Sequence, residues 1–270
     1  QEPALATWQH QCEFDNTNYS RGFMPGVLPV VRNIWNWSAN IENSSSAYEC
    51  LKDLKQSLVN GDEPTRVEAA YLLGEMQSDE AVDALLEGLT HVEESVRRAS
   101  CYGLKVSGAA QADKILPYVD NQRVSTRRLA VYALGEASNG SNAKVVGALL
   151  AALTNDQDDL VRSNAAYAMG QIFRCKVSDF SAAIDALIHR LSPGIEPNNT
   201  EVALFPRSTV RQSIAYSLLQ AASNHEFSFE QIEKLLALTL EDDDRYVQGF
   251  AIEITRQNQN LSARSVDALL

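Results

Sequence analysis

Cysteine is scarce in this chain, and no two cysteines lie close together in the sequence. Cys12, Cys50, Cys101 and Cys175 form no CxxC pair, which excludes the common zinc and thiol-redox motifs. No hydrophobic run approaches the ~18 consecutive apolar residues that a membrane span requires. The first residues have neither the basic nor the apolar region of a signal peptide. These absences predict a cytoplasmic protein without a membrane span, in a compartment that keeps thiols reduced.

Signatures of catalysis are missing as well. The sequence contains no P-loop, no glycine-rich dinucleotide fingerprint and no nucleophile elbow. His225-Glu226 is its only adjacent His–Glu pair, and His10, His91 and His189 are scattered. The acidic run 242–244 lies at the expected start of a helix, where carboxylates complement the helix dipole. The sequence therefore predicts no catalytic residue, no metal ligand and no cofactor.

Basic residues are outnumbered by acidic ones. The chain has 35 acidic and 23 basic side chains and a net charge of -12. A phosphate backbone is repelled by such a charge, and nucleic-acid-binding proteins usually carry a basic patch. We therefore expect no nucleic-acid partner for this acidic protein. With 45% hydrophobic residues, the chain can still bury a large core.

What the chain does contain is a nine-residue motif that recurs along most of its length. Each copy begins with arginine and has tyrosine five residues later, as in 162–170. A degenerate sixth copy begins at Gln248 and has Glu253 in the tyrosine position. This self-similarity predicts stacked repeats that bury their apolar faces against one another. The five full copies begin at Arg66, Arg97, Arg127, Arg162 and Arg211.

The apolar spacing within each repeat predicts two helices joined by a short turn. Leucines at helical spacing, such as Leu85, Leu86 and Leu89, indicate the first helix, and the motif forms the second. We therefore expect an all-α fold, an α-α superhelix of about six helix pairs over residues 46–270. The expected pairs are 47–59 with 64–76, 79–90 with 95–106, 111–119 with 124–137, 142–154 with 159–174, 179–191 with 207–222, and 229–240 with 244–258.

Two segments depart from the repeat pattern. Residues 1–45 contain all three tryptophans and a stretch rich in glycine and proline. They are predicted to be an irregular capping or linker segment, because an open end of the stack exposes an apolar face. A docking segment or the tail of an upstream domain is the alternative. Residues 192–206 separate the two helices of the fifth pair, as a functional loop or as a tolerated insertion.

The motif places its tyrosine on one side of the second helix. At 100° per residue, Val161, Ala165 and Met169 cluster on one face, and Tyr167 lies almost opposite them. This arrangement predicts a row of exposed tyrosines, roughly 40 Å long, in the concave groove of the superhelix. Exposed aromatic rings with a polar end are common anchors for protein partners. Lateral support of one ring by the next is the alternative use. The candidate partner-binding residues are Tyr71, Tyr102, Tyr132, Tyr167, Tyr216, Glu75, Glu136, Gln171, Arg98 and Arg128.

The motif arginines receive the opposite interpretation. Acidic or amide residues precede most of them in the turn between the two helices, such as Glu93, Asn121 and Asp156. We expect each arginine to bridge its turn to the adjacent repeat through backbone carbonyls or a carboxylate. Alanine at Arg162 should then destabilise the fold, whereas alanine at Tyr132 or Tyr167 should weaken partner binding and leave thermal stability nearly unchanged.

The string from Val161 to Gly170 resembles the HEAT-like repeats of the phycobilisome-lyase type, and the likeness extends over residues 47–258 in six units. The resemblance implies a HEAT/armadillo-like solenoid. Members with lyase activity attach or detach bilin chromophores, so the resemblance also implies a groove that could hold a tetrapyrrole. Deoxyhypusine hydroxylase is a further HEAT-like solenoid, but its iron site needs several His–Glu pairs, which this chain lacks.

These observations predict a non-catalytic scaffold or adaptor that holds a protein partner or a neighbouring domain in its tyrosine-lined groove. One alternative is a phycobilin lyase-like chromophore chaperone, for which a bilin would occupy the groove. Another is an accessory region of a larger enzyme whose catalytic residues lie elsewhere.

Overall fold

Each copy of the motif forms the second helix of a helical hairpin. The computed structural model describes residues 44–108, 111–138, 142–174, 180–192, 194–195, 209–240 and 242–257. Their regular elements are all helical, as predicted, and the expected α-α superhelix is confirmed. Residues 1–43 of the expected capping or linker segment and most of the expected insertion at 192–206 lie outside the described residues, and residues 44–45 already belong to the first described helix.

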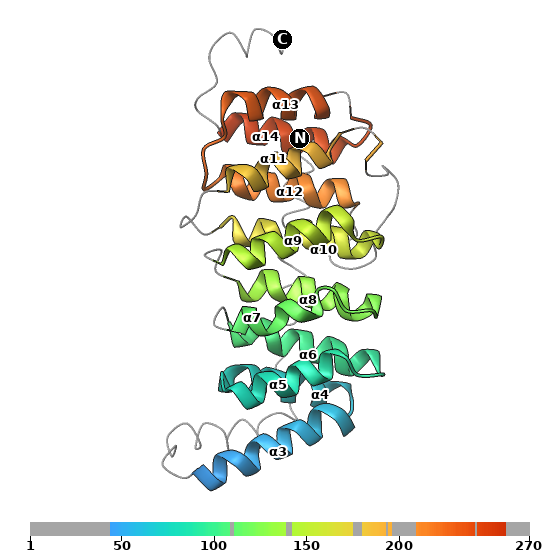
Figure 1. Ribbon diagram of the computed structural model, residues 1–270, viewed down its shortest axis with the longest axis vertical. Helices are drawn as coiled ribbons and strands as arrows, with labels where there is room; N and C mark the ends of the chain where they lie inside the picture. The colour runs from blue at the N-terminus through green and yellow to red at the C-terminus, as the bar shows by residue number, and fades with distance from the viewer. Residues whose placement is uncertain are drawn as a thin grey trace.

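The helices follow the predicted pairs closely. Figure 1 shows these pairs stacked one above another in chain order. The pairs are α3 (Ser44–Asn60) with α4 (Glu63–Met76), α5 (Asp79–Leu89) with α6 (Glu94–Ser107), α7 (Ala112–Ile115) and the 3-10 turn η2 (Leu116–Tyr118) with α8 (Val124–Ala137), α9 (Ala143–Asn155) with α10 (Asp159–Ile172), α11 (Ser181–Arg190) with α12 (Val210–Ala222), and α13 (Phe229–Thr239) with α14 (Arg245–Gln257).

Local chemistry explains where these helices start and stop. Asp158 caps α10 by accepting a hydrogen bond from the Val161 backbone N–H at 3.0 Å. Thr209 and Ser228 form capping boxes at the starts of α12 and α13. The expected helix over 111–119 is broken into α7 and η2, because Pro117 has no N–H to donate within an α-helix.

The second helices form the central contact of the stack. Helices α4, α6, α8, α10, α12 and α14 each pack directly against the next one in this series. Side chains such as Leu104, Leu134 and Met169 are fully buried, and one hydrophobic cluster runs through the described repeats. None of the described helices combines the length and apolar character needed to cross a bilayer.

Glycine permits the closest of these helix contacts. A Cβ atom added at Gly135 on α8 would lie 2.3 Å from the Ala168 Cβ on α10. A Cβ atom at Gly103 on α6 would lie 2.4 Å from the Ala70 carbonyl oxygen on α4. The absence of a side chain at Gly103 and at Gly135 therefore permits the close approach of α4 to α6 and of α8 to α10.

Alanine at Gly135 is expected to lower the free energy of unfolding by about 1–3 kcal/mol, because α8 and α10 must move apart to admit the methyl group. The matched control is alanine at Gly147 on α9, whose added Cβ would have no neighbour within 4 Å. That change should stabilise the protein by about 0.5 kcal/mol through reduced entropy of the unfolded chain. Urea unfolding followed by circular dichroism compares the two. Equal effects would show that the contact at Gly135 does not limit packing.

Candidate functional site

The five motif tyrosines lie on the second helices and form what we call the tyrosine face: Tyr71, Tyr102, Tyr132, Tyr167 and Tyr216. The ring of Tyr71 stacks on that of Tyr102 with centroids 6.1 Å apart. Tyr132 stacks on Tyr167 at 5.9 Å, and Tyr167 stacks on Tyr216 at 6.1 Å. The predicted row is thus present as two stacks, one of two rings and one of three.

The exposure of these rings is less uniform than predicted. Tyr71 is 40% exposed, whereas Tyr216 is only 5% exposed. Tyr102, Tyr132 and Tyr167 are half-buried. The prediction of exposure is therefore wrong for Tyr216, because Phe250 of the following repeat packs against its ring at 6.4 Å. Burial, followed by the charge of Glu136, raises the pKa values of Tyr132 and Tyr167 far above their usual range.

Glu136 connects three repeats through its carboxylate. It accepts a hydrogen bond from the Tyr167 hydroxyl at 3.2 Å and forms an ion pair with the Lys105 ammonium at 3.1 Å. Its side chain is only 12% exposed. Lys105 lies on α6, Glu136 on α8 and Tyr167 on α10, so these contacts hold consecutive second helices together. Glu136 was predicted to contact a partner, but its carboxylate oxygens instead bind Tyr167 and Lys105 of the same chain.

In the first repeat, the residue that corresponds to Glu136 is exposed to solvent. Glu75, four residues after Tyr71, is exposed. Burial, together with the charge of Glu75 and a side-chain hydrogen bond to it, raises the pKa of Tyr71. Among the described residues, no lysine, arginine or histidine forms an ion pair with Glu75. Gln171, the corresponding residue of the fourth repeat, is half-buried.

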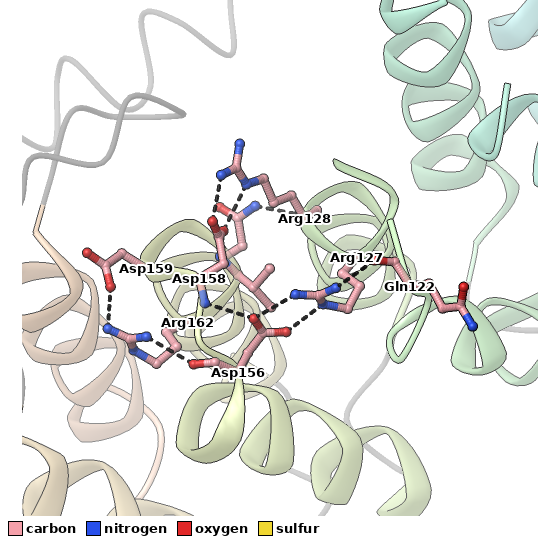
Figure 2. Close-up of polar contacts among 9 residues, drawn as sticks. Gln122, Arg127, Arg128, Asp156, Asp158, Asp159 and Arg162 are labelled. Carbon is pink, nitrogen blue, oxygen red and sulfur yellow. Dashed lines mark hydrogen bonds and ion pairs between the residues drawn. The ribbon is translucent and has the colours of Figure 1, made fainter. Parts of the chain in front are cut away.

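The two candidate arginines differ from one another. Arg128 makes two hydrogen bonds to the Asp158 carboxylate, at 2.8 and 2.6 Å, which Figure 2 shows between neighbouring repeats. Asp158 in turn caps α10, so Arg128 is engaged in holding the next repeat and is not free for a partner as expected. Arg98 is 56% exposed and, within the part of the chain that the structure describes, pairs with Glu94 of its own helix, at 3.3 Å.

The predicted structural role of the motif arginines is confirmed. Arg127 donates to the Asn121 carbonyl at 3.0 Å and to both oxygens of Asp156, at 2.7 and 3.0 Å. Arg162 donates to the Asp156 carbonyl at 2.9 Å and pairs with Asp159. Figure 2 shows Asp156 between the two guanidinium groups. Each arginine thus closes its own turn, and the Asp156 side chain carries the link to the preceding repeat.

The degenerate sixth copy preserves this contact with a different residue. The Gln248 amide donates to the carbonyls of Leu240 and Asp242, at 3.1 and 2.7 Å. Arg211 pairs with the Asp242 carboxylate and donates to the Leu191 carbonyl at 2.7 Å. The motif therefore extends structurally to α14, although its tyrosine position holds Glu253.

The described residues provide no cluster typical of a metal site. No group of three or more histidine, cysteine, aspartate or glutamate side chains in that part of the chain is arranged to bind a metal ion. Burial, followed by the charge of Glu136, raises the pKa of the Cys101 thiol to about 12, so this cysteine is a buried packing residue.

The geometry defines an α-solenoid built from helix pairs. A family model described as HEAT repeats matches residues 112–194, and another described as PBS lyase HEAT-like repeat matches residues 65–91. The matched segments are thus HEAT-like repeats. No curated protein matches it.

Similar solved structures include engineered, designed and human proteins. The crystal structure of an engineered protein is 18% identical, covers 77% of this chain and 97% of its own, and has a TM-score of 0.45. A designed armadillo repeat protein in complex with the peptide (KR)4 is 16% identical, covers 77% of this chain and 98% of its own, and has a TM-score of 0.45. Human deoxyhypusine hydroxylase in complex with glycerol is 17% identical, covers 78% of this chain and 85% of its own, and has a TM-score of 0.28.

Proposed function

We propose that this protein is a non-catalytic HEAT-repeat scaffold that binds a protein partner or a neighbouring domain on its tyrosine face. The observation that carries the proposal is Tyr71, a large aromatic side chain that is 40% exposed at the end of a ring stack. Tyrosine at an exposed position supplies a large contact area and a polar end, which is typical of partner-binding residues.

The contacts between neighbouring repeats support the same function, because they make the tyrosine face rigid. The Glu136 and Arg128 side chains connect consecutive repeats and fix the spacing of the rings. A surface that is ordered before binding loses less conformational entropy when a partner docks. We place the centre of contact at Tyr71, Glu75 and Tyr102, with Arg98 and Gln171 as flanking residues. Tyr132 and Tyr167 contribute the exposed parts of their half-buried side chains.

A photo-crosslinking comparison tests this proposal. The crosslinking residue benzoylphenylalanine replaces Tyr71 or Tyr102 in separate variants and, as a matched control, replaces Tyr48 on the first helix α3. Tyr48 is 67% exposed, so it is at least as accessible as Tyr71. The proposal predicts a discrete protein adduct from positions 71 and 102 that is missing from position 48. The same adducts from all three positions would contradict binding on the tyrosine face.

The bilin hypothesis has one specific observation in its favour, the match of residues 65–91 to the PBS lyase HEAT-like repeat. It predicts a change in the visible absorbance of phycocyanobilin when the pigment is mixed with the protein, or pigment transfer to an antenna subunit. Absence of both results would exclude the lyase-like function. The scaffold proposal itself requires no cofactor, and the expected cytoplasmic location and the lack of a nucleic-acid partner stay predictions.

A further inference from the structure

Two repeats of the tyrosine face already hold a cation that the chain itself supplies. For this comparison, a rung is a motif tyrosine together with the residue four positions after it. In the rung of Tyr132 and Glu136, the ammonium of Lys105 pairs with the carboxylate at 3.1 Å. In the rung of Tyr216 and Gln220, the Arg174 guanidinium donates to the phenol oxygen at 3.2 Å and to the amide oxygen at 3.3 Å.

Both cations come from the preceding repeat. Lys105 belongs to α6, which precedes α8, and Arg174 lies two residues after the end of α10, which precedes α12. The first rung, Tyr71 and Glu75 on α4, has no earlier motif copy in the sequence to supply such a residue. Its carboxylate is exposed, and no described cationic side chain forms an ion pair with it. The first rung therefore has the acceptor of the other two without their cation.

The surroundings of this rung carry further negative charge. Glu68 precedes Tyr71 by three residues, so the two side chains lie on one face of α4. The Glu68 carboxylate is half-buried, and one of its oxygens is sealed from solvent without a hydrogen-bond partner. Arg98, on the neighbouring helix α6, forms an ion pair with Glu94 of its own helix. The whole chain carries a net charge of -12, which favours the approach of a cationic partner.

From these observations we infer that the first rung binds an arginine or lysine side chain of the protein partner, with the cation between the Glu75 carboxylate and the rings of Tyr71 and Tyr102. The carboxylate supplies an ion pair, and the ring face supplies a cation–π contact. This inference rests on the proposed function, because it specifies the chemistry of the partner at the tyrosine face.

A titration followed by NMR tests the inference on the full chain. The probe is N-acetyl-arginine methylamide, and the matched neutral compound is N-acetyl-citrulline methylamide. We expect the arginine compound to shift the backbone amide signals of α4 near Tyr71 and of α6 near Tyr102, and the citrulline compound to leave them in place. The experiment is made at low ionic strength, since salt screens an exposed ion pair.

Two charge-matched variants locate the binding site. Glu75→Gln should weaken the binding of the arginine probe about two- to fivefold, because it removes the ion pair and keeps the size of the side chain. Glu230→Gln changes the net charge equally but lies on α13, at the other end of the described repeats, and should leave the affinity unchanged. Tyr71→Leu should also weaken binding, by loss of the cation–π contact.

Several results would overturn the inference. Equal binding of the citrulline compound would show that charge is not recognised, and equal effects of Glu75→Gln and Glu230→Gln would show diffuse attraction only. Binding that appears only after Arg21→Gln and Arg32→Gln would assign the site to an arginine of this chain. A partner that still crosslinks at position 71 while the arginine probe fails would leave the proposed function standing and reject only the cationic class.

Discussion

Alanine in place of Tyr167 is expected to lower the free energy of unfolding by about 2–4 kcal/mol. The ring is stacked between Tyr132 and Tyr216, at centroid distances of 5.9 and 6.1 Å. Its removal leaves both neighbours with an uncovered face and leaves Glu136 without its 3.2 Å hydrogen bond. This result would reverse the sequence-based expectation that stability is nearly unchanged. Chemical denaturation followed by circular dichroism measures the difference.

The matched control is Tyr71→Ala. This ring is stacked on one side only and is 40% exposed, so its loss should cost less than about 1 kcal/mol. Tyr167→Phe separates the two contributions, because it keeps the stack and removes only the hydroxyl. We expect it to cost about 1 kcal/mol. Equal destabilisation by Tyr71→Ala and Tyr167→Ala would contradict the difference in burial that distinguishes the two ends of the tyrosine face.

The helix pairs were predictable because the information that specifies them is local. An apolar residue every three or four positions defines each helix, and capping residues such as Ser78, Thr209 and Ser228 lie directly before a helix start. The contacts of Arg127 and Arg162 with their own turns were predictable for the same reason, since donor and carbonyl are six residues apart.

The depth of each tyrosine was not predictable from the helix period. The helical periodicity places Tyr216 on the side of its helix opposite the apolar stripe. It does not show which side chains of the following repeat cover that side. The ring of Tyr216 is covered by Phe250. Phe250 lies three residues before Glu253, which holds the tyrosine position of the sixth motif copy. The close approach of α8 to α10 at Gly135 similarly depends on Ala168, a residue of another repeat. The burial of a residue between two repeats therefore depends on the sequences of both repeats and cannot be deduced from one of them alone.

The proposed cation site at the first rung follows from the position of that rung in the series of motif copies. Within the stack, each second helix receives contacts from the helix before it, as Glu136 does from Lys105. The first motif copy lacks this predecessor, so the same residue types are left available at Glu75. Repetition of one motif thus gives structural residues in the middle of the array and candidate binding residues at its end.

Arg211→Ala is expected to have the largest effect, a loss of about 3–5 kcal/mol. The ion pair of Arg211 with Asp242 is the most buried one in the described residues, with side chains 4% and 1% exposed. Alanine leaves the Asp242 charge buried without its partner and removes the donor to the Leu191 carbonyl. Because Asp242 precedes α14 and Leu191 follows α11, the loss should uncouple the last helix pair. Hydrogen exchange should therefore increase in α13 and α14 and stay slow in α6.

A double-mutant cycle separates the ion pair from the other contacts of Arg211. Asp242→Asn combined with Arg211→Ala should destabilise less than the sum of the single changes, because neither charge is then left buried alone. Arg98→Ala, which removes an exposed guanidinium paired with Glu94 of its own helix, should change stability by less than about 0.5 kcal/mol. Strict additivity of the two single changes would mean that the charges do not interact. Faster exchange in α6 as well would mean that the array unfolds as one unit, since a stack joined through neighbouring contacts should lose its last pair first.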